Sequence, residues 1–458
     1  MPSYRDEQIL VISPGSETTC AQFGLAESLS PPSIVIPTRV YSHVGHLHEK
    51  NYFSSKGDES NVIYPLKAGK IVNLPAFLYL LKMIHKTVSQ TILPNAVSNI
   101  AVLLVSSSQW SRLQTETITQ FIFENIQVPA FTIIPEALAG AFAYGLQDLC
   151  VVDIGKDKTE ITPILDFSVA DHARLVVNKG SSSINAQLQE KLPHLEAYQI
   201  EDLKKSDIFE ILSEDARKSS WFALNETGAP EGEEEGVIDV AAIVASGRVR
   251  EALAEKEKEK NNATKVAPSV PNSEKETNTF IDSKGNSHEV GKERFSGTED
   301  LITAIVQAVG QAIYQIDEVS RRQDCWDNII VIGGCTGIKG MREMIYARLC
   351  EDYIVFRQST YSEMGSAFTS ARNTPTGTAT PPVIYGGAHQ GEHGQVPTTI
   401  KFAKMAEYFP EWKSYGWENV SFLGAQIGAK AIFSGNTDGT FLTLSEYNDV
   451  GPTSIWDI

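Results

Sequence analysis

The sequence predicts an α/β protein built from two related halves, with two polar insertions. Short apolar segments suited to buried strands alternate with segments whose apolar residues recur at helical spacing. The order of apolar strand, glycine-containing turn and helix occurs in the first half and again near residue 330. A chain of 458 residues with 42% hydrophobic side chains is long enough for two lobes, each with its own core.

The beginning of the chain predicts a hairpin, a helix and a central strand. Ile9–Ser13 and Thr19–Phe23 are apolar runs on either side of a Pro14-Gly15 turn. Apolar residues of segment 77–88 recur at helical spacing, and segment 101–105 is a short, continuously apolar strand. These elements alternate as expected for a sheet covered by helices.

Two helices and a strand complete the first half and open the second. Thr115–Ile126 is amphipathic and ends before Pro129. Pro135–Tyr144 is rich in alanine and closes at Gly145, a residue suited to a helix C-cap. Residues 149–154 form an apolar strand that runs into an aspartate and a glycine, the layout of a loop that can cradle a phosphate.

The same order returns near the end, between two insertions. Residues 328–332 predict a strand, 333–340 a glycine-rich turn and 341–349 a helix. An acidic stretch at about 227–279 and a Ser, Thr, Pro and Gly-rich stretch at 358–397 depart from this pattern. We expect both to be flexible surface insertions.

Composition narrows the class of protein. The chain has 39 Lys and Arg against 57 Asp and Glu, a net charge of −18, which argues against nucleic acid as a direct partner and favours a basic protein partner. Its five cysteines are odd in number and lack a Cys-x-x-Cys pair, so neither a metal site nor a disulfide framework is expected. With no signal peptide and no apolar run of about 18 residues, we expect an intracellular protein without a membrane span.

Several segments of the chain resemble actin and occur in the same order as in that family. They are Tyr64–Leu66, Thr119–Glu124, Phe280–Leu301, Gly333–Thr336, Phe422–Ile427 and Glu446–Pro452. The resemblance implies the fold shared by actin, hexokinase and the heat-shock 70 ATPases, in which two α/β lobes surround a central cleft. It also implies a single fold over 1–458, divided into a first lobe at 1–144 with a small subdomain at about 42–63, a second lobe at 145–357, and C-terminal helices at 398–458 that return to the first lobe.

The first phosphate loop of the family is altered here. Actin-type ATPases clamp the nucleotide phosphates between two hairpins, with glycine N–H groups near the phosphates and aspartates that hold Mg²⁺. Ser13 stands at an aspartate position, Pro14 lacks an N–H donor, and Glu17 replaces a glycine. In addition, Cys20 replaces a lysine. A carboxylate about 4 Å from a phosphate costs about 4 kcal/mol at an effective dielectric near 20, which lowers affinity by about three orders of magnitude if Glu17 points inward.

The second phosphate loop is altered in a complementary way. Asp153 and Gly155 match the family, whereas Lys156 stands at an aspartate position and Asp157 at a glycine position. Since Glu17 and Lys156 carry opposite charges on facing loops, we predict that they pair across the phosphate site and close the cleft without a ligand.

The residues at the positions of actin's catalytic and adenosine-binding groups are compatible either with a purely structural cleft or with weak nucleotide binding. Glu136 stands where actin has the glutamine that positions water, and Glu160 where it has a histidine; a glutamate can still act as a base. The glycines of the cleft either serve tight turns or retain weak nucleotide binding without turnover. We expect no cofactor, ATP being the one candidate ligand. The residues expected in this degenerate nucleotide cleft are Ser13, Gly15, Ser16, Glu17, Glu136, Asp153, Gly155, Lys156, Gly333, Gly334 and Thr336.

The resemblance also implies an apolar groove that receives an amphipathic helix, between the two large subdomains. The matching residues are Phe142, Ala143, Gly145, Phe167, Ile427, Gly428 and Ala431. The alternative is that Phe142 and Ile427 are ordinary core residues. Tyr408–Tyr415 is aromatic and either packs on the core or contacts an accessory subunit.

Within the family, the likeness is greatest to fungal nuclear actin-related proteins of SWI/SNF and RSC chromatin remodelers. The shared phrases are Gln22–Leu25, Ile208–Ser213, Phe409–Lys413 and Phe422–Ile427. This implies a nuclear, non-catalytic architectural subunit that pairs with a second actin-related protein of the actin-related protein 7 type and binds the helical helicase-SANT-associated segment of the motor ATPase. Two alternatives are an actin-like ATP-binding or ATP-hydrolysing protein and a filament-forming protein. The altered loops argue against the former, and the short, divergent region 42–61 against the latter.

Overall fold

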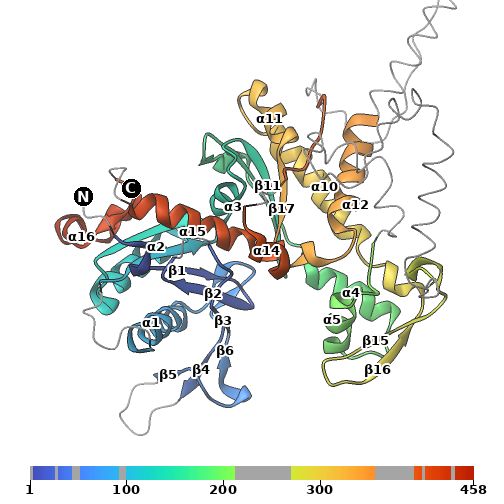
Figure 1. Ribbon diagram of the computed structural model, residues 1–458, viewed down its shortest axis with the longest axis horizontal. Coiled ribbons are helices and arrows are strands. Elements are labelled where there is room, and N and C mark those ends of the chain that lie inside the picture. Colours follow the sequence, from blue (N-terminus) through green and yellow to red (C-terminus); the bar gives the residue numbers. More distant parts are fainter. Residues whose placement is uncertain are drawn as a thin grey trace, which may run out of the picture.

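Two α/β lobes lie side by side in the computed structural model, with the C-terminal helix α15 crossing the upper face of the first (Figure 1). The structure describes residues 4–25, 29–43, 52–91, 99–211, 270–355, 397–404, 408–434 and 439–458. Most of the predicted acidic insertion, the whole Ser/Thr/Pro/Gly insertion except residue 397, and part of the 42–61 region lie outside these ranges.

The first lobe contains a six-stranded sheet in the order β18-β10-β9-β1-β2-β3. Its strands are β1 (Ile9–Pro14), β2 (Thr18–Phe23), β3 (Ile34–Pro37), β9 (Ala101–Ser106), β10 (Ala130–Pro135) and β18 (Leu442–Thr443). Strand β1 is antiparallel to β2 and parallel to β9, and β9 is parallel to β10. The predicted hairpin and central strand are confirmed.

Helices cover both faces of this sheet, which explains why its central strands are apolar throughout. Leu10 and Ile12 of β1 pack in the core formed with α1 (Leu74–Thr91) and α2 (Arg112–Phe121). Ile9 and Val11 point the other way, into the core that contains residues of α3 (Glu136–Tyr144) and α15 (Val420–Phe433). The predicted helix at 115–126 consists of the end of α2 and the π-helical turn η3 (Ile122–Ile126). The predicted C-cap at Gly145 is confirmed by its left-handed φ of 66°.

A small sheet extends from the first lobe below the main one (Figure 1). Its strand order is β5-β4-β6, and a separate two-stranded ribbon, β7-β8, follows in the chain. These strands are β4 (Val40–His43), β5 (Tyr52–Ser54), β6 (Val62–Ile63), β7 (Leu66–Lys67) and β8 (Lys70–Ile71).

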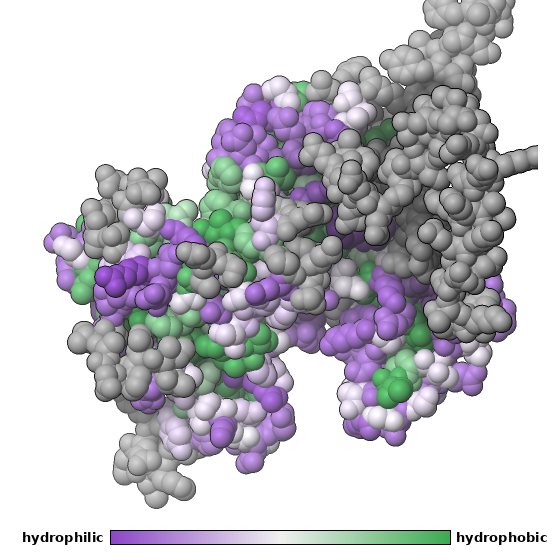
Figure 2. Space-filling model, in the orientation of Figure 1, coloured by the Kyte–Doolittle hydropathy of each residue, from purple (hydrophilic) through white to green (hydrophobic). Residues whose placement is uncertain are grey.

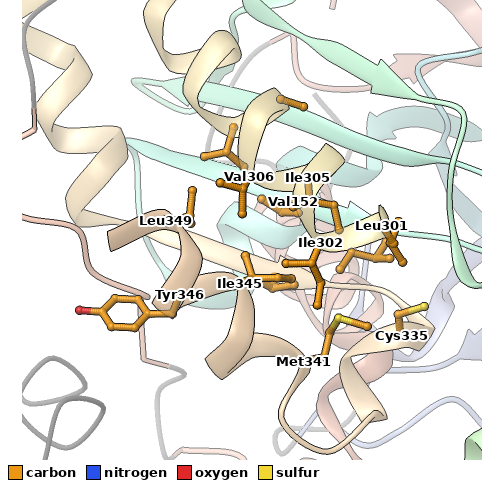
Figure 3. Packing of buried hydrophobic residues seen from close by; sticks show 14 of the residues in the cluster. Val152, Leu301, Ile302, Ile305, Val306, Cys335, Met341, Ile345, Tyr346 and Leu349 are labelled. Carbon is orange, nitrogen blue, oxygen red and sulfur yellow. The ribbon is translucent and has the colours of Figure 1, made fainter. Parts of the chain in front are cut away.

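The second lobe repeats the hairpin, parallel strand and helix arrangement of the first. Its sheet has the order β13-β12-β11-β17, and β14 pairs with β12. The strands are β11 (Leu149–Ile154), β12 (Thr159–Leu165), β13 (Ser168–Val169), β14 (Leu175–Val177) and β17 (Ile329–Ile332). Its helices are α10 (Glu299–Tyr314), α11 (Arg322–Asp327) and α12 (Met341–Cys350). Figure 3 shows this core, where Ile302 and Ile305 of α10 lie between Val152 of β11 and Ile345 of α12.

The remaining part of the second lobe consists of α4 (Ser181–Lys191), α5 (Ala197–Lys205) and the hairpin of β15 (Asn278–Ile281) and β16 (Ser287–Val290). A buried arginine holds the segment that begins at residue 270. Arg294 is fully buried and donates to the carbonyls of Asn272 at 2.7 Å and Lys275 at 2.6 Å. Asn272 in turn donates to the Ile208 carbonyl at 2.8 Å and to Glu210 Oε1 at 3.0 Å. These bonds join the chain just before residue 212 to the chain just after residue 269.

The C-terminal segment joins both lobes. Phe402 packs in the second-lobe core and bridges Ile329 of β17, so residues 397–404 lie on the second lobe before the chain returns to the first. After α14 (Pro410–Tyr415), α15 and α16 (Leu444–Val450) lie on the first lobe. Trp412 is completely buried, and its indole N–H donates to the Leu29 carbonyl at 2.8 Å, so it packs on the core, whereas Tyr408 is 85% exposed.

Short helical turns complete the described chain. They are η1 (Asp6–Gln8), η2 (Glu59–Asn61), η4 (Asp171–Ala173), η5 (Asn272–Glu274), η6 (Lys292–Phe295), η7 (Val319–Arg321), η8 (Gly334–Gly337), η9 (Glu351–Val355), η10 (Trp417–Asn419) and η11 (Pro452–Trp456). Within the described ranges, none of the helices has the length and apolar character needed to cross a membrane. All five cysteines are buried free thiols.

Candidate functional site

A cavity of about 540 Å³ opens between the lobes, at the place where the sequence predicts the nucleotide cleft. Its wall brings together nearly all the residues expected there. These are Ser13, Gly15, Ser16, Glu17, Glu136, Asp153, Gly155, Lys156, Gly333 and Gly334. Thr336 is not part of this wall, because its hydroxyl turns back and donates to the Gly333 carbonyl at 2.8 Å. That hydroxyl stabilises η8 and does not face the cavity.

The two hairpins that bound the cavity are built in the same way. The Gly15 N–H donates to the Thr18 carbonyl at 2.9 Å, and the Gly155 N–H donates to the Lys158 carbonyl at 2.9 Å. A Cβ atom at Gly15 would lie 2.8 Å from the Thr18 carbonyl oxygen, so this turn needs glycine regardless of any ligand. Both glycine N–H groups are engaged within their own hairpins, which favours the interpretation that tight turns account for them.

An ion pair links the two hairpins across the cavity, as the sequence predicted. Lys156 Nζ lies 2.5 Å from Glu17 Oε1, and the hydrogen bond with Glu17 raises the pKa of Lys156. Their side chains are 46% and 59% exposed, so the pair lies at the open side of the cleft. The predicted pairing is confirmed, but the pair does not close the cleft, because a cavity of about 540 Å³ remains open beside it.

Carboxyl groups line the floor of the cleft around one lysine. Lys158 Nζ lies 2.6 Å from Glu160 Oε2 and 3.3 Å from Ser107 Oγ. Burial raises the pKa of Glu136, and it raises the pKa of Asp153 well above its ordinary range, where the neighbouring charge of Glu136 adds to the effect. Lys158 opposes both shifts. The one aspartate that the sequence retains from the family is therefore held toward its neutral form.

A second cavity of about 20 Å³ lies among these carboxyl groups, bounded also by Arg174. This volume has room for about one water molecule. Among the residues that the structure describes, no group of three His, Cys, Asp or Glu side chains has a geometry that could hold a metal ion.

Lysines on the second-lobe wall are also paired. Lys204 Nζ lies 2.7 Å from Glu201 Oε2 and 2.9 Å from Asn185 Oδ1, and Lys205 Nζ lies 3.3 Å from Glu201 Oε1. Although burial alone would raise it, hydrogen bonds from Lys204 and Asn185 lower the pKa of Glu201 to about 2. Sequence reasoning missed this cluster; the Glu201 and Lys204 spacing of three residues on a helix was the available signal.

The turn expected to hold adenosine contains two glycines with different requirements. Gly333 has a φ of 93°, and a Cβ atom there would lie 2.6 Å from the Ile154 carbonyl oxygen, so its contact with β11 requires glycine. Gly334 has open space around its Cβ position. Glu418 of η10 approaches η8 so closely that a Cβ atom at Gly337 would lie 2.1 Å from its Oε1. A further carboxylate, which the sequence did not indicate, therefore lines this side.

These observations decide how well the cleft fits a nucleoside triphosphate. A lysine–carboxylate pair links the two hairpins, two glycine donors are engaged, and the retained aspartate is held toward its neutral form. These three features disfavour a metal-bound triphosphate.

The predicted partner-helix residues lie where the two lobes meet. The Phe142 and Phe167 ring centroids are 5.6 Å apart, and a Cβ atom at Gly428 would lie 2.9 Å from the Phe142 ring. Ile427 and Phe142 are both half-buried against the core that contains α15, and Ala431 is exposed. Figure 2 shows hydrophobic side chains gathered over α3 and α15 on this face.

Two of the predicted groove residues have structural roles. Ala143 is buried in a core cluster with residues of β11 and β17, and Gly145 caps α3 in an exposed left-handed conformation. Phe142, Phe167, Ile427 and Ala431 also reach the surface, whereas Gly428 is buried.

The family model for actin matches residues 4–363. The chain belongs to the actin family. Its two lobes with their duplicated hairpins therefore form an actin-like fold.

Known relatives of this actin-family chain include a subunit of chromatin-remodeling complexes and other actin-related proteins. It is 31% identical to the "SWI/SNF and RSC complexes subunit arp9" of Schizosaccharomyces pombe, with 99% of each chain aligned. Shorter matches are 28% identity to actin-related protein 7 of Saccharomyces cerevisiae, over 22% of this chain and 20% of that protein, and 30% identity to actin-related protein 4 of Mycosarcoma maydis, over 20% and 17%. The similarity to the fission yeast subunit extends over both whole chains.

Proposed function

We propose that this protein is a nuclear, non-catalytic architectural subunit of a SWI/SNF or RSC type chromatin-remodeling complex. The similarity to a subunit of those complexes over 99% of both chains supports the complex assignment. The Glu17–Lys156 ion pair carries the non-catalytic part of the proposal. An acidic side chain in the phosphate position disfavours ATP, and its lysine partner holds the hairpins together without a ligand.

The partners proposed are a second actin-related protein of the actin-related protein 7 type and the helical helicase-SANT-associated segment of the motor ATPase. The aromatic pair Phe142 and Phe167, with Ile427 beside α15, offers an apolar surface of the kind that receives an amphipathic helix. A net charge of −18 favours a basic partner, chiefly through faster association.

A second candidate function is weak or regulatory ATP binding. The size of the cavity, about 540 Å³, and the open space at Gly334 favour it. Glu136 has a raised pKa and could act as a base in such a site.

One purification distinguishes these functions. The tagged protein is recovered from nuclear extract, its partners are identified by mass spectrometry, and bound nucleotide is extracted and quantified. We expect a remodeler ATPase, a second actin-related protein and no stoichiometric nucleotide. Absence of a remodeler ATPase overturns the first function, and stoichiometric ATP supports the second.

A variant tests where the motor segment binds. Phe142→Asp should reduce recovery of the motor subunit, because it places a charge between Phe167 and α15. The matched control is Ile281→Asp on β15, which changes a side chain that is 71% exposed in the distant hairpin. Equal recovery with both variants would move the binding site elsewhere.

A further inference from the structure

The turn between β12 and β13 holds two bulky residues in an unusual backbone conformation. Leu165 pairs with Ser168, so Asp166 and Phe167 form a two-residue hairpin loop. Their φ angles are +52° and +56°. Such loops ordinarily use Asn-Gly or Asp-Gly, because both central residues adopt positive φ. A phenylalanine in this conformation is uncommon and persists where surrounding contacts fix it.

Those contacts come from a neighbouring loop and from Arg321 at the end of η7. The Asp166 N–H donates to Asp148 Oδ1 at 2.9 Å, and the Phe167 N–H donates to the Gln147 carbonyl at 3.0 Å. Arg321 pairs with Asp148 and, at 3.1 Å, with Asp166. One guanidinium therefore holds both carboxylates that define the turn.

The result is an aromatic ring fixed at the surface. Phe167 is 39% exposed and its ring lies 5.6 Å from that of Phe142, which packs over Gly428 of α15. A ring presented in one orientation loses little conformational entropy when a partner covers it. Aromatic residues with such support are typical binding hot spots.

The charges around the turn are unequal. Three carboxylates, those of Asp148, Asp166 and Asp324, share the single guanidinium of Arg321. Asp166 and Asp324 are 70% and 51% exposed, so this excess of negative charge faces solvent beside Phe167. A basic side chain placed next to an apolar anchor would complement it.

We propose that Arg321 is a positioning residue that holds Phe167 as a preformed anchor for a helical partner, and that the carboxylates around it select a helix with a basic residue beside its apolar anchor. The inference rests on the proposed helix-binding function and adds to it the chemistry of the partner.

Two synthetic amphipathic helical peptides serve as probes. Their apolar faces are identical, and one carries lysine and the other glutamate beside the central leucine. Binding to the full-length protein is measured by fluorescence anisotropy. We expect the lysine peptide to bind more tightly, by about tenfold at low salt, with the difference shrinking at high salt.

A double-mutant cycle tests the role of Arg321. The probe is a third peptide with serine beside the central leucine, because Arg321→Ala leaves three carboxylates without their counter-charge and these would attract lysine. Phe167→Ala and Arg321→Ala should each weaken binding of this peptide by about tenfold, and the double variant should be weaker by no more than about twofold beyond either. Arg321→Lys keeps the charge and should recover part of the affinity. If the two losses of affinity multiply in the double variant, Arg321 acts independently of Phe167, and the positioning role is overturned.

Further variants test the charge and the controls. Asp324→Asn should slow association of the lysine peptide, whereas Asp207→Asn, at a carboxylate that is 95% exposed beside Lys339, should not. Equal binding of both peptides overturns the proposed partner chemistry. A wild-type protein that recovers a remodeler ATPase from extract but binds neither peptide overturns this inference alone, and failure to recover the ATPase overturns the proposed function.

Discussion

The ion pair between Glu17 and Lys156 yields a prediction that can be worked out in magnitude. Glu17→Gly removes the carboxylate from the phosphate position and frees Lys156, which lies 2.5 Å away. At about 4 Å and an effective dielectric near 20, a carboxylate and one phosphate charge repel by about 4 kcal/mol, or about three orders of magnitude in affinity. Because both side chains are half exposed and Lys156 already offsets part of the charge, we expect Mg·ATP affinity to rise by between about tenfold and about a thousandfold.

Isothermal titration calorimetry with a non-hydrolysable ATP analogue measures this change. Exposed ion pairs contribute about 0.2–1 kcal/mol to folding, so the melting temperature should change little and a gain in affinity cannot come from refolding. Glu276→Gly is the matched control, since it breaks an exposed pair with Lys292 of 2.9 Å outside the cleft. The double variant Glu17→Gly with Lys156→Asp restores the residue types of the family at these two positions.

Two outcomes would refute the reasoning. One is micromolar binding of Mg·ATP by the wild-type protein, and the other is a Glu17→Gly affinity no higher than that of Glu276→Gly.

Three stability predictions follow from the same structure. Gly333→Ala should lower the melting temperature because a Cβ atom there would lie 2.6 Å from a carbonyl oxygen at positive φ, whereas Gly334→Ala, with open space, should not. Trp412→Ala should cost about 3–5 kcal/mol in urea unfolding because the indole is fully buried, against little change for Tyr408→Ala. Burial raises the Asp153 pKa above its unfolded value, so the native state retains the proton and stability falls as pH rises from about 4 toward the raised pKa. Asp153→Asn should therefore raise the melting temperature above that of the wild type by more at pH 8 than at pH 4. An equal change at the two pH values would contradict the raised pKa.

The strands and helices followed from the sequence where burial alone dictates them. Residues 9–12 and 149–152 are apolar throughout because both sheet faces are covered, and that pattern is visible without a structure. The Glu17–Lys156 pair could also be predicted, because the two hairpins face each other across the cavity and the sequence places opposite charges in their loops. Local pattern thus carried the strands and helices, and the resemblance to actin carried the two-lobed fold and the centre of the cleft.

Other features depend on contacts that no local pattern encodes. Glu418 reaches η8 from a segment about eighty positions later in the chain. Phe167 adopts a left-handed conformation without glycine because Arg321, far away in sequence, fixes the turn. Thr336 matches the family in sequence, yet its hydroxyl donates to the Gly333 carbonyl. A threonine hydroxyl can bond to the backbone of a turn as readily as to a ligand, and the sequence does not tell which.

The anchoring of Asn272 to Ile208 and Glu210 has a consequence for how this protein can change over evolutionary time. The second lobe is closed by contacts on either side of segment 212–269, with Arg294 fastening the far side. Asn272 also accepts a hydrogen bond from Arg294 Nε at 3.0 Å, so one side chain is held from both directions. A substitution at Arg294 has to suit Asn272 and its partners Ile208 and Glu210 at the same time, and these positions should therefore change together among descendants of this chain.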